Sequence, residues 1–152
     1  MIEYPKPQEL QSLDLKKYKR IVCVFGSRDW NDRKYFHEKI LDFLSDIEEP
    51  VLFVSGAASS GADDLIIRWC AKFRYPCLSI PADWEANSRA AGFIRNTKMA
   101  HIVTDGICFY DGASRGTAHM LEECEKLNKP VRTFYIKQKH NNEDHQKSTL
   151  VI

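Results

Sequence analysis

The sequence predicts an α/β fold, a three-layer sandwich with a mainly parallel five-stranded sheet as its middle layer. Five short runs of apolar and β-branched residues alternate along the chain with four stretches whose apolar residues recur at helical spacing. Each run begins or ends beside glycine, proline or aspartate, which interrupt regular structure. Apolar strands indicate burial on both faces, and strand–helix alternation indicates parallel crossover connections.

The five apolar runs are the predicted strands. The first, RIVCVF, stops at Gly26, and the second, third and fifth each follow a proline: Pro50, Pro76 and Pro130. Proline cannot continue a helix, so each marks the entry into the next strand. We expect strands at 20–25, 51–55, 77–80, 106–110 and 131–136.

The helices lie between these strands. Three of them carry one apolar face at helical spacing, as at Leu65, Ile66 and Trp69. The third predicted helix is rich in Arg, Asn and Ala, so its facing surface is less apolar. We expect helices at 35–47, 61–73, 87–101 and 117–127.

The chain of 152 residues fits one domain and shows no internal repeat. Residues 1–19 are polar, contain two prolines and are expected to form an N-terminal arm. The domain itself is expected at 20–136. Residues 137–152 are expected to be a polar tail, whose last residues, TLVI, could dock on the body or on a partner.

Charge, hydropathy and the spacing of cysteines and histidines argue against several classes of protein. With 22 Lys and Arg against 21 Asp and Glu, the net charge of +1 argues against binding duplex nucleic acid by bulk charge. No apolar run approaches the roughly 20 residues of a membrane span, and the N-terminus lacks an apolar signal core, so we expect a cytoplasmic protein. The five cysteines form no C-x-x-C pair and are expected to be reduced, small buried side chains. The histidines show no metal-ligand spacing, so no metal site is predicted.

Loops at the strand ends hold the candidate site. In open α/β sheets, ligands bind outside the carboxyl ends of the strands. Five of the seven glycines fall in the segments that follow these ends. Glycine permits close backbone approach to a ligand, and the free N–H groups of helix N-termini favour anions. The segments are 26–30, 56–63, 82–84 and 111–117.

The segment GASRGT is the strongest local motif. Gly112 turns the chain out of the strand, while Gly116 and Thr117 open the helix and offer N–H and hydroxyl donors. This pattern fits a phosphate cradle, and the alternative is a tight turn without a ligand. It matches neither G-x-x-x-x-G-K-[ST] nor G-x-G-x-x-G.

Arginines gather at the same predicted edge. Arg28 and Arg115 lie in the loops, and Arg89 and Arg95 lie in the helix after 82–84. Their planar guanidinium groups suit bidentate phosphate binding, although any single one could be a solvated surface residue.

Other loop side chains have two interpretations. Trp30 and Trp84 each follow an aspartate and could close a small core or stack on a base. Asp63, in the first turn of its helix, could interact favourably with the positive end of the helix dipole, or it could contact a ribose. His119 is a weak candidate for a general base.

Five motifs in order resemble the SLOG superfamily, named for Smf/DprA and LOG, and in particular its small YspA-like branch. The motifs are GSRDW at 26–30, SGAASSGAD at 55–63, PADW at 81–84, AAGFIRNTKM at 90–99 and RGTAHM at 115–120. The resemblance covers about 20–136 and implies a Rossmann-like parallel sheet whose loops bind nucleotides or nucleotide-derived ligands. Some LOG relatives are phosphoribohydrolases that cleave the N-glycosidic bond of a nucleoside monophosphate.

This sequence matches some of the site residues of the LOG enzymes and departs from others. Arg95 matches an arginine at the catalytic centre of LOG enzymes, and Gly116 and Thr117 match the Gly-Thr of their P-G-G-x-G-T-x-x-E phosphate loop. Asp111 stands where that motif has proline, and the loop is one residue longer. Met120 stands where it has the catalytic glutamate.

Three hypotheses follow. The first is a sensor or sequestering protein for a nucleotide-derived ligand. It requires no cofactor, and the ligand's phosphates could carry Mg²⁺. The second is a phosphoribohydrolase or related N-glycosidase, in which Arg95 orients the ligand and Asp83 or Asp29 stabilises positive charge on the ribose. The third is single-stranded nucleic-acid binding, against which the net charge argues. The resemblance also implies a homodimer or higher homo-oligomer.

The candidate ligand-binding residues share a place in these loops or in the helix turns after them. They are Gly26, Ser27, Arg28, Asp29, Trp30, Ser55, Gly56, Ala57, Gly61, Asp63, Asp83, Trp84, Arg89, Arg95, Asn96, Gly112, Ser114, Arg115, Gly116 and Thr117.

Overall fold

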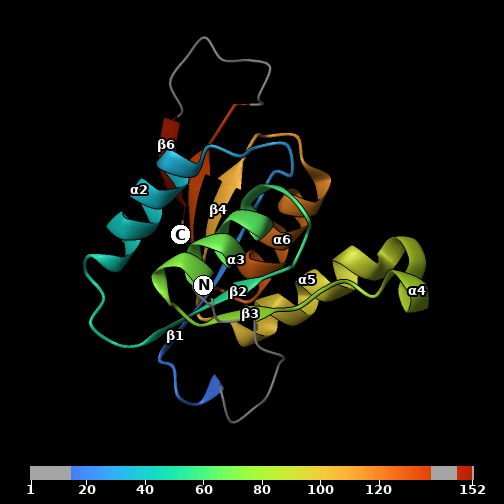
Figure 1. Cartoon of the computed structure of the whole chain (residues 1–152). Helices are drawn as coiled ribbons and strands as arrows, with labels where there is room; N and C mark the ends of the chain where they lie inside the picture. The colour runs from blue at the N-terminus through green and yellow to red at the C-terminus, as the bar shows by residue number, and fades with distance from the viewer. Residues whose placement is uncertain (1–14, 138–146, 152) are drawn as a thin grey trace, which may run out of the picture.

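A computed structural model of the protein describes residues 15–137 and 147–151. Its centre is one sheet in the order β3-β2-β1-β4-β5-β6 (Figure 1). The first five strands run parallel, as predicted, and β6 is antiparallel to β5. The strands are β1 (Arg20–Gly26), β2 (Val51–Ser55), β3 (Cys77–Ser79), β4 (Asp105–Tyr110), β5 (Val131–Tyr135) and β6 (Lys147–Val151).

Helices cover both faces of the sheet, which confirms the predicted sandwich (Figure 1). The helix at 61–73 is found with the predicted bounds. The helices are α2 (Arg33–Leu44), α3 (Gly61–Phe73), α4 (Trp84–Asn87), α5 (Ala91–Ile102) and α6 (Arg115–Lys126), and the short 3₁₀ helix η1 (Ser88–Ala90) joins α4 to α5.

The helix expected at 35–47 is found at Arg33–Leu44, and two further elements differ more strongly from the sequence-based expectation. The helix expected at 87–101 begins only at Ala91, because the chain turns at Ser88, where φ is 52°. Residues Lys147–Val151, expected to be part of a polar tail, form β6 along the free edge of β5. Of the arm expected at 1–19, residues 1–14 lie outside the described residues, as do residues 138–146 and 152 of the expected tail.

Strand β1 separates the two halves of the core. Val22 and Val24 point to the side covered by α2 and α3, where Phe36 and Phe53 are also buried. The alternate residues Ile21, Cys23 and Phe25 face the other side, with Met99 of α5 and Met120 of α6. This alternation buries both faces of a central strand, as a parallel sheet requires.

The cysteines are free and buried, as the sequence predicts. Burial raises the pKa of the Cys108 thiol because it disfavours the thiolate. The residues described here contain no group of His, Cys, Asp and Glu that could hold a metal ion. Within the same residues, no helix is both long and apolar enough to span a membrane.

The sheet order sets the position of the site. From β1 the chain moves outward to β2 and β3, then returns to β4 on the other side of β1. The carboxyl ends of β1 and β4 therefore form the switch point where α/β sheets bind ligands. Gly26 ends β1 so close to β4 that an added Cβ would overlap the carbonyl oxygen of Phe109.

Candidate functional site

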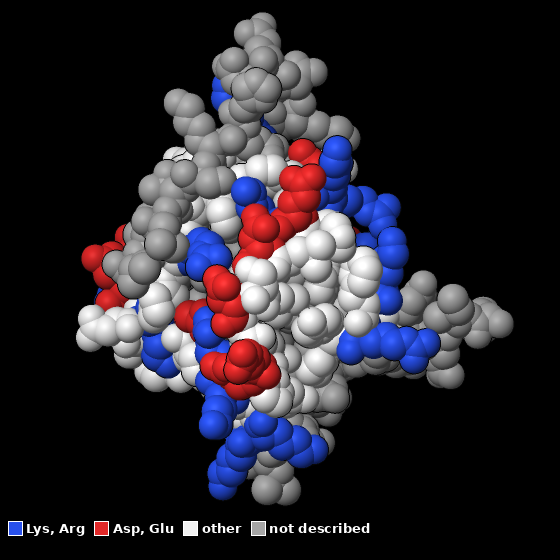
Figure 2. Space-filling view, turned by 90° about the vertical axis from the view of Figure 1, so that its left-hand side faces the viewer, with Lys and Arg blue, Asp and Glu red and all other residues white. Residues whose placement is uncertain are grey.

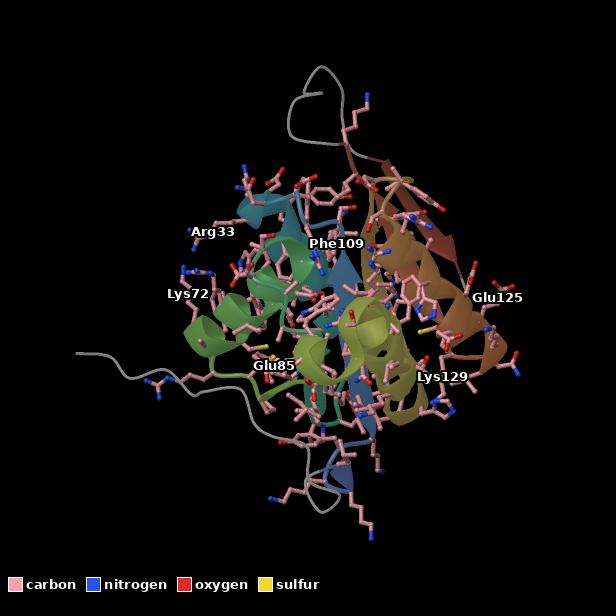
Figure 3. The ribbon with its side chains drawn as sticks, turned by 90° about the vertical axis from the view of Figure 1, so that its right-hand side faces the viewer. Arg33, Lys72, Glu85, Phe109, Glu125 and Lys129 are labelled. Carbon is pink, nitrogen blue, oxygen red and sulfur yellow. The ribbon has the colours of Figure 1, made fainter. Side chains whose placement is uncertain are left out.

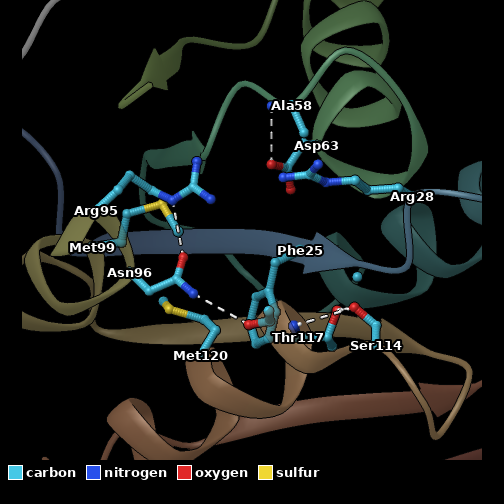
Figure 4. A pocket seen from close by; sticks show the side chains of 12 residues that line it. Phe25, Arg28, Ala58, Asp63, Arg95, Asn96, Met99, Ser114, Thr117 and Met120 are labelled. Carbon is cyan, nitrogen blue, oxygen red and sulfur yellow. Dashed lines mark hydrogen bonds between the residues drawn. The ribbon is translucent and has the colours of Figure 1, made fainter. Parts of the chain in front are cut away.

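A pocket of about 120 Å³ lies at the carboxyl ends of β1 and β4 (Figure 4). At roughly 30 Å³ per water, it has room for a group of phosphate size. A wider hollow adjoins it, and Arg28 lines both. The pocket is lined by Phe25, Gly26, Arg28, Ala58, Asp63, Arg95, Asn96, Met99, Ser114, Gly116, Thr117 and Met120.

The first turn of α6 forms one wall. Asp111 shapes the loop before it, because its Oδ1 accepts hydrogen bonds from the N–H groups of Ala113 at 2.8 Å and Ser114 at 2.9 Å. Ser114 is the N-cap and accepts a hydrogen bond from the Thr117 hydroxyl at 2.9 Å. No acidic residue lies in this turn, so the positive end of the helix dipole is left for an anion.

Arg95 forms the opposite wall. Its Nη1 donates to the carbonyl oxygen of Gly56, and its Nε donates to Oδ1 of Asn96 at 2.9 Å. Asn96 in turn donates from Nδ2 to the carbonyl oxygen of Gly116 at 3.2 Å. These bonds tie the guanidinium both to the loop after β2 and to the start of α6.

Burial sets the electrostatics of Arg95. Partial burial lowers the pKa of its guanidinium, attraction by Asp63 raises it, and repulsion by Arg28 lowers it. A positive group that is partly stripped of water and repelled by a second one gains from an anion placed between them. The pair of arginines therefore favours a phosphate in the pocket.

Asp63 is the carboxylate of this pocket. It is 8% exposed, and its Oδ2 accepts a hydrogen bond from the N–H of Ala58 at 3.1 Å. Burial raises the pKa of its carboxyl group, and the Ala58 hydrogen bond and the charges of Arg95 and Arg28 oppose that rise. An added Cβ at Gly56 would lie 2.6 Å from Nη1 of Arg95 and 2.9 Å from Oδ2 of Asp63, so glycine is needed there.

Two contacts lock the loops together. Gly61 has a φ of +72°, and an added Cβ would overlap the carbonyl oxygen of Ser27. Ser27 is buried, and its hydroxyl accepts a hydrogen bond from the N–H of Asp111 at 3.1 Å. These contacts join the loops after β1, β2 and β4 into one frame around the pocket.

Many of the predicted site residues meet in this frame. Those that line the pocket are Gly26, Arg28, Asp63, Arg95, Asn96, Ser114, Gly116 and Thr117. Ser27, Ser55 and Gly56 are buried in the frame, where the Ser55 hydroxyl donates to the carbonyl oxygen of Asp63. Ala57, at a φ of 62°, forms the turn beside them. Asp29 and Gly61 line the adjoining hollow.

Other predicted residues lie elsewhere. Trp30 is 3% exposed and stacks on Phe109 in the core, at 4.8 Å between ring centroids, so it is unavailable for stacking on a base. Asp83 is exposed and caps α4 by accepting a hydrogen bond from the N–H of Ala86 at 3.0 Å. Arg89 is exposed in η1, and neither Asp83 nor Arg89 lines the pocket.

Three further predicted residues lie at the margin. Trp84 is 54% exposed. A Cβ added to Gly92 would lie 3.6 Å from Cη2 of Trp84 and 3.9 Å from Nη2 of Arg95, so both side chains lie beside Gly92. The Trp84 indole is therefore near the Arg95 wall. Gly112 and Arg115 are exposed beside the loop before α6 and do not line the pocket.

Four apolar residues of the pocket are absent from the predicted site residues. They are Phe25, Ala58, Met99 and Met120. The sequence patterns assign Phe25 to a strand and the two methionines to helices. Met120, which the sequence resemblance aligns with the glutamate of the LOG motif, is 1% exposed. His119 stacks on Phe93 at 4.2 Å between ring centroids, and its Nδ1 lies 3.3 Å from Nδ2 of Asn96.

Sequence comparison relates the chain to known proteins. Residues 20–86, which contain β1, β2, α3 and the loops around Asp63, match the family described as YspA, cpYpsA-related SLOG. The Gene 61 protein of Mycobacterium phage D29 is 34% identical over 122 residues, an alignment covering 76% of this chain and 96% of that protein. No solved structure matches the chain significantly. The shared sequence and the frame of loops at the switch point show that the chain belongs to the YspA, cpYpsA-related SLOG family.

Proposed function

We propose that the protein binds a nucleotide or a nucleotide-derived phosphorylated ligand at this pocket, as a sensor or sequestering protein. The observation that carries the proposal is that the Arg95 guanidinium and the first turn of α6 line the same pocket. Membership of the SLOG family supports a nucleotide-related role in general. A guanidinium and a helix N-terminus together supply the donors and positive charge that a phosphate needs.

The two hollows suggest how such a ligand lies. The pocket at α6 has the size of a phosphate group, and the adjoining hollow is larger, about 670 Å³. Ser59, Ser60 and Asp64 line that hollow and could hydrogen-bond to ribose hydroxyls. Trp84 is an exposed aromatic side chain near Arg95 on which a base could stack.

The proposal favours binding over catalysis because of Met120. Glycosidic cleavage develops positive charge on the ribose, which a nearby carboxylate stabilises. A thioether at that position carries no charge. The pocket keeps the groups that hold a phosphate, while the position of the relatives' glutamate is apolar.

A thermal-shift panel tests the proposal. The ligands are nucleoside mono-, di- and triphosphates, ADP-ribose and cyclic nucleotides, each with and without Mg²⁺. A ligand at 100 times its Kd adds about 2.7 kcal/mol of stability. The matched control is Gly116→Leu, because Gly116 lines the pocket and nothing lies within 4 Å of a Cβ added there, so a larger side chain fits without a clash and should narrow the pocket. The proposal fails if no ligand raises the melting temperature, or if the control responds like the wild type.

The second candidate is an N-glycosidase acting on nucleoside 5′-monophosphates. Asp63 favours it, because this carboxylate lines the pocket with Arg95, whereas Asp83 caps α4 and Asp29 lies in the adjoining hollow. In this reaction water adds to C1′, the C1′–N bond breaks, and the base leaves with a proton. Asp63 would stabilise the positive charge that develops on the ribose.

Incubation with AMP and analysis of the products tests this candidate. We expect free adenine and ribose 5-phosphate from the wild type, a loss of about 10²-fold or more in Asp63→Asn, and little change in Asp83→Asn. If no base is released, or if Asp83→Asn is the variant that loses activity, Asp63 is not the catalytic carboxylate.

We also propose a homodimer, which the resemblance implies. Phe93 and Ile94 on α5 support it, since these apolar side chains are 47% and 39% exposed. Analytical ultracentrifugation of the wild type and of Ile94→Asp tests the assembly. A monomeric wild type, or a dimer unaffected by the substitution, would argue against this face.

A further inference from the structure

A groove between α2 and α3 lies apart from the nucleotide pocket and combines an apolar floor with a cationic border. It encloses about 420 Å³, and it shares Leu65 with the hollow beside the pocket and no residue with the pocket itself. Phe36, at 1% exposed, and Trp69, at 6%, form its floor, and Phe73 at its end is 39% exposed.

Four cations border the groove. Arg33 and Lys34 come from the first turn of α2, and Arg68 and Lys72 come from α3. The side chains of Arg33 and Lys72 extend to the same side of the molecule (Figure 3). Figure 2 shows an uncharged area with Lys and Arg side chains along its right-hand border and Asp and Glu side chains along its left.

Most of this positive charge is uncompensated. Arg68 pairs with Asp64, with 2.7 Å between Nε and Oδ2. In the described part of the chain, no carboxylate forms an ion pair with Arg33, Lys34 or Lys72, and Nζ of Lys72 lies 5.5 Å from the centroid of the Phe73 ring. A cluster of like charges around exposed apolar surface is stabilised by an occupant that is both anionic and apolar.

The shape of the floor favours a helical peptide. Leu65, Trp69 and Phe73 are spaced i, i+4 and i+8 and make a strip along α3. Arg68 and Lys72 belong to the same helix, and Arg33 and Lys34 belong to α2. An amphipathic helix lays such a strip of its own into a groove and places its polar flanks against the borders.

The aromatic packing argues against a nucleic acid. The rings of His37 and Phe73 stack on each other at 5.0 Å, and the Trp69 ring packs against Phe73 at 4.8 Å between centroids. Nε1 of Trp69 also donates to Nδ1 of His37 at 2.9 Å. Because these rings cover one another, they offer an apolar wall more than open faces on which bases could stack.

We propose that the α2–α3 groove is the docking site for an acidic amphipathic helix of a partner protein. The partner's apolar side chains would contact Trp69 and Phe73. Its Asp or Glu side chains would pair with Arg33, Lys34 and Lys72. The site is separate from the nucleotide pocket and does not depend on the function proposed there.

Fluorescence anisotropy with a defined probe tests the site in the full chain. The probe is a labelled 15-residue helical peptide with Leu at i, i+4 and i+8 and Glu at the flanking positions, and the control peptide has Gln in place of every Glu. We expect saturable, salt-sensitive binding of the first peptide and binding about tenfold or more weaker for the second. Amide shifts confined to α2 and α3 in NMR spectra would place the peptide in the groove.

Four variants separate the contributions. Arg33→Glu with Lys72→Glu should weaken binding about tenfold or more, and Phe73→Ser should weaken it without a change in charge. Lys19→Glu with Lys98→Glu, two exposed lysines outside the groove, is the charge-matched control and should leave binding within about twofold. Gly116→Leu should leave it unchanged, which separates this site from the nucleotide pocket.

Several outcomes would overturn the proposal. They are no peptide binding, equal effects of the groove and control charge reversals, and tighter binding of a dT12 oligonucleotide that the groove variants abolish. The last result would assign the groove to single-stranded nucleic acid.

Discussion

Asn96 donates a hydrogen bond from Nδ2 to the carbonyl oxygen of Gly116, 3.2 Å away, and so joins α5 to the first turn of α6. The Oδ1 of the same side chain accepts a hydrogen bond from Nε of Arg95. The amide therefore sets the position of both groups proposed to hold the phosphate. Its burial, at 4% exposed, makes these bonds costly to break.

Substitution of Asn96 should affect stability and ligand binding together. Asn96→Leu is similar in size but leaves the Gly116 carbonyl and the Arg95 Nε without their partner, and we expect a loss of roughly 1–3 kcal/mol in the free energy of unfolding. Asn96→Asp keeps an acceptor for Arg95 but places a carboxylate against the Gly116 carbonyl, so it should lose comparable stability. Urea denaturation measures both. An unchanged midpoint in both variants would show that the amide does not support the frame.

Gly61→Ala tests the close approach of the loops after β1 and β2. The added Cβ would overlap the carbonyl oxygen of Ser27, and φ at this position is +72°. Gly112→Ala is the matched control, since its φ is +84° but nothing lies within 4 Å of the added Cβ. Backbone strain alone costs about 1–2 kcal/mol, so Gly112→Ala should lose that amount and Gly61→Ala clearly more. Equal losses by thermal denaturation would mean that the two loops do not touch closely.

Gly116→Ala should stabilise the protein and weaken its ligand response. Alanine favours a helix over glycine, and nothing lies within 4 Å of the new Cβ, so we expect a gain of about 0.5 kcal/mol. The methyl group would reduce the space for a phosphate at the first turn of α6. Melting temperatures with and without the best ligand of the panel measure both effects. A larger ligand shift in the variant than in the wild type would contradict a phosphate at this position.

Asp63 should make stability depend on pH in an identifiable direction. Burial raises the pKa of its carboxyl group above the ordinary 3.8, so the folded protein keeps the proton to higher pH than the unfolded chain. The contribution of Asp63 to the free energy of unfolding should therefore fall as the pH rises from about 3.8 through the folded-state pKa. Asp63→Asn retains an acceptor for the Ala58 N–H and removes the titration.

Urea denaturation of the wild type and Asp63→Asn between pH 3.5 and 7 measures this difference. The stability of the wild type relative to the variant should decrease with rising pH. The opposite slope would show that attraction by Arg95 and Arg28 outweighs the cost of burial.

Local sequence patterns predicted the regular elements well where burial is periodic. Helix α3 has the predicted bounds because Leu65, Ile66 and Trp69 recur at the spacing that one helical face requires. The predicted start of the helix at 87–101 is too early. Residues 87–90 contain no large apolar side chain that would specify a buried helix face, and the turn at Ser88 interrupts the helix. Strand β6 was missed because pairing with the edge of β5 is a contact between distant segments, which local periodicity does not reveal.

Two loop side chains show what sequence left open. For Trp30 the sequence allowed either core packing or base stacking, and the contact with Phe109 of the distant strand β4 places it in the core. For Asp63 it allowed a helix-dipole role or a ligand contact, and the structure places the carboxylate in the pocket near Arg95. Each outcome depends on which strands are neighbours in the sheet.

The sequence by itself determined the alternation of strands and helices, the glycine-rich loops after the strands, and a set of motifs shared with one family. These features are encoded locally, in hydrophobic spacing and in residues with particular backbone freedom. The tertiary structure alone decided which loop residues share a pocket, with Arg95, Asp63 and the first turn of α6 brought together and Trp30 and Asp83 left out. That choice depends on strand order and on close approaches such as Gly61 to Ser27, which join segments far apart in the chain.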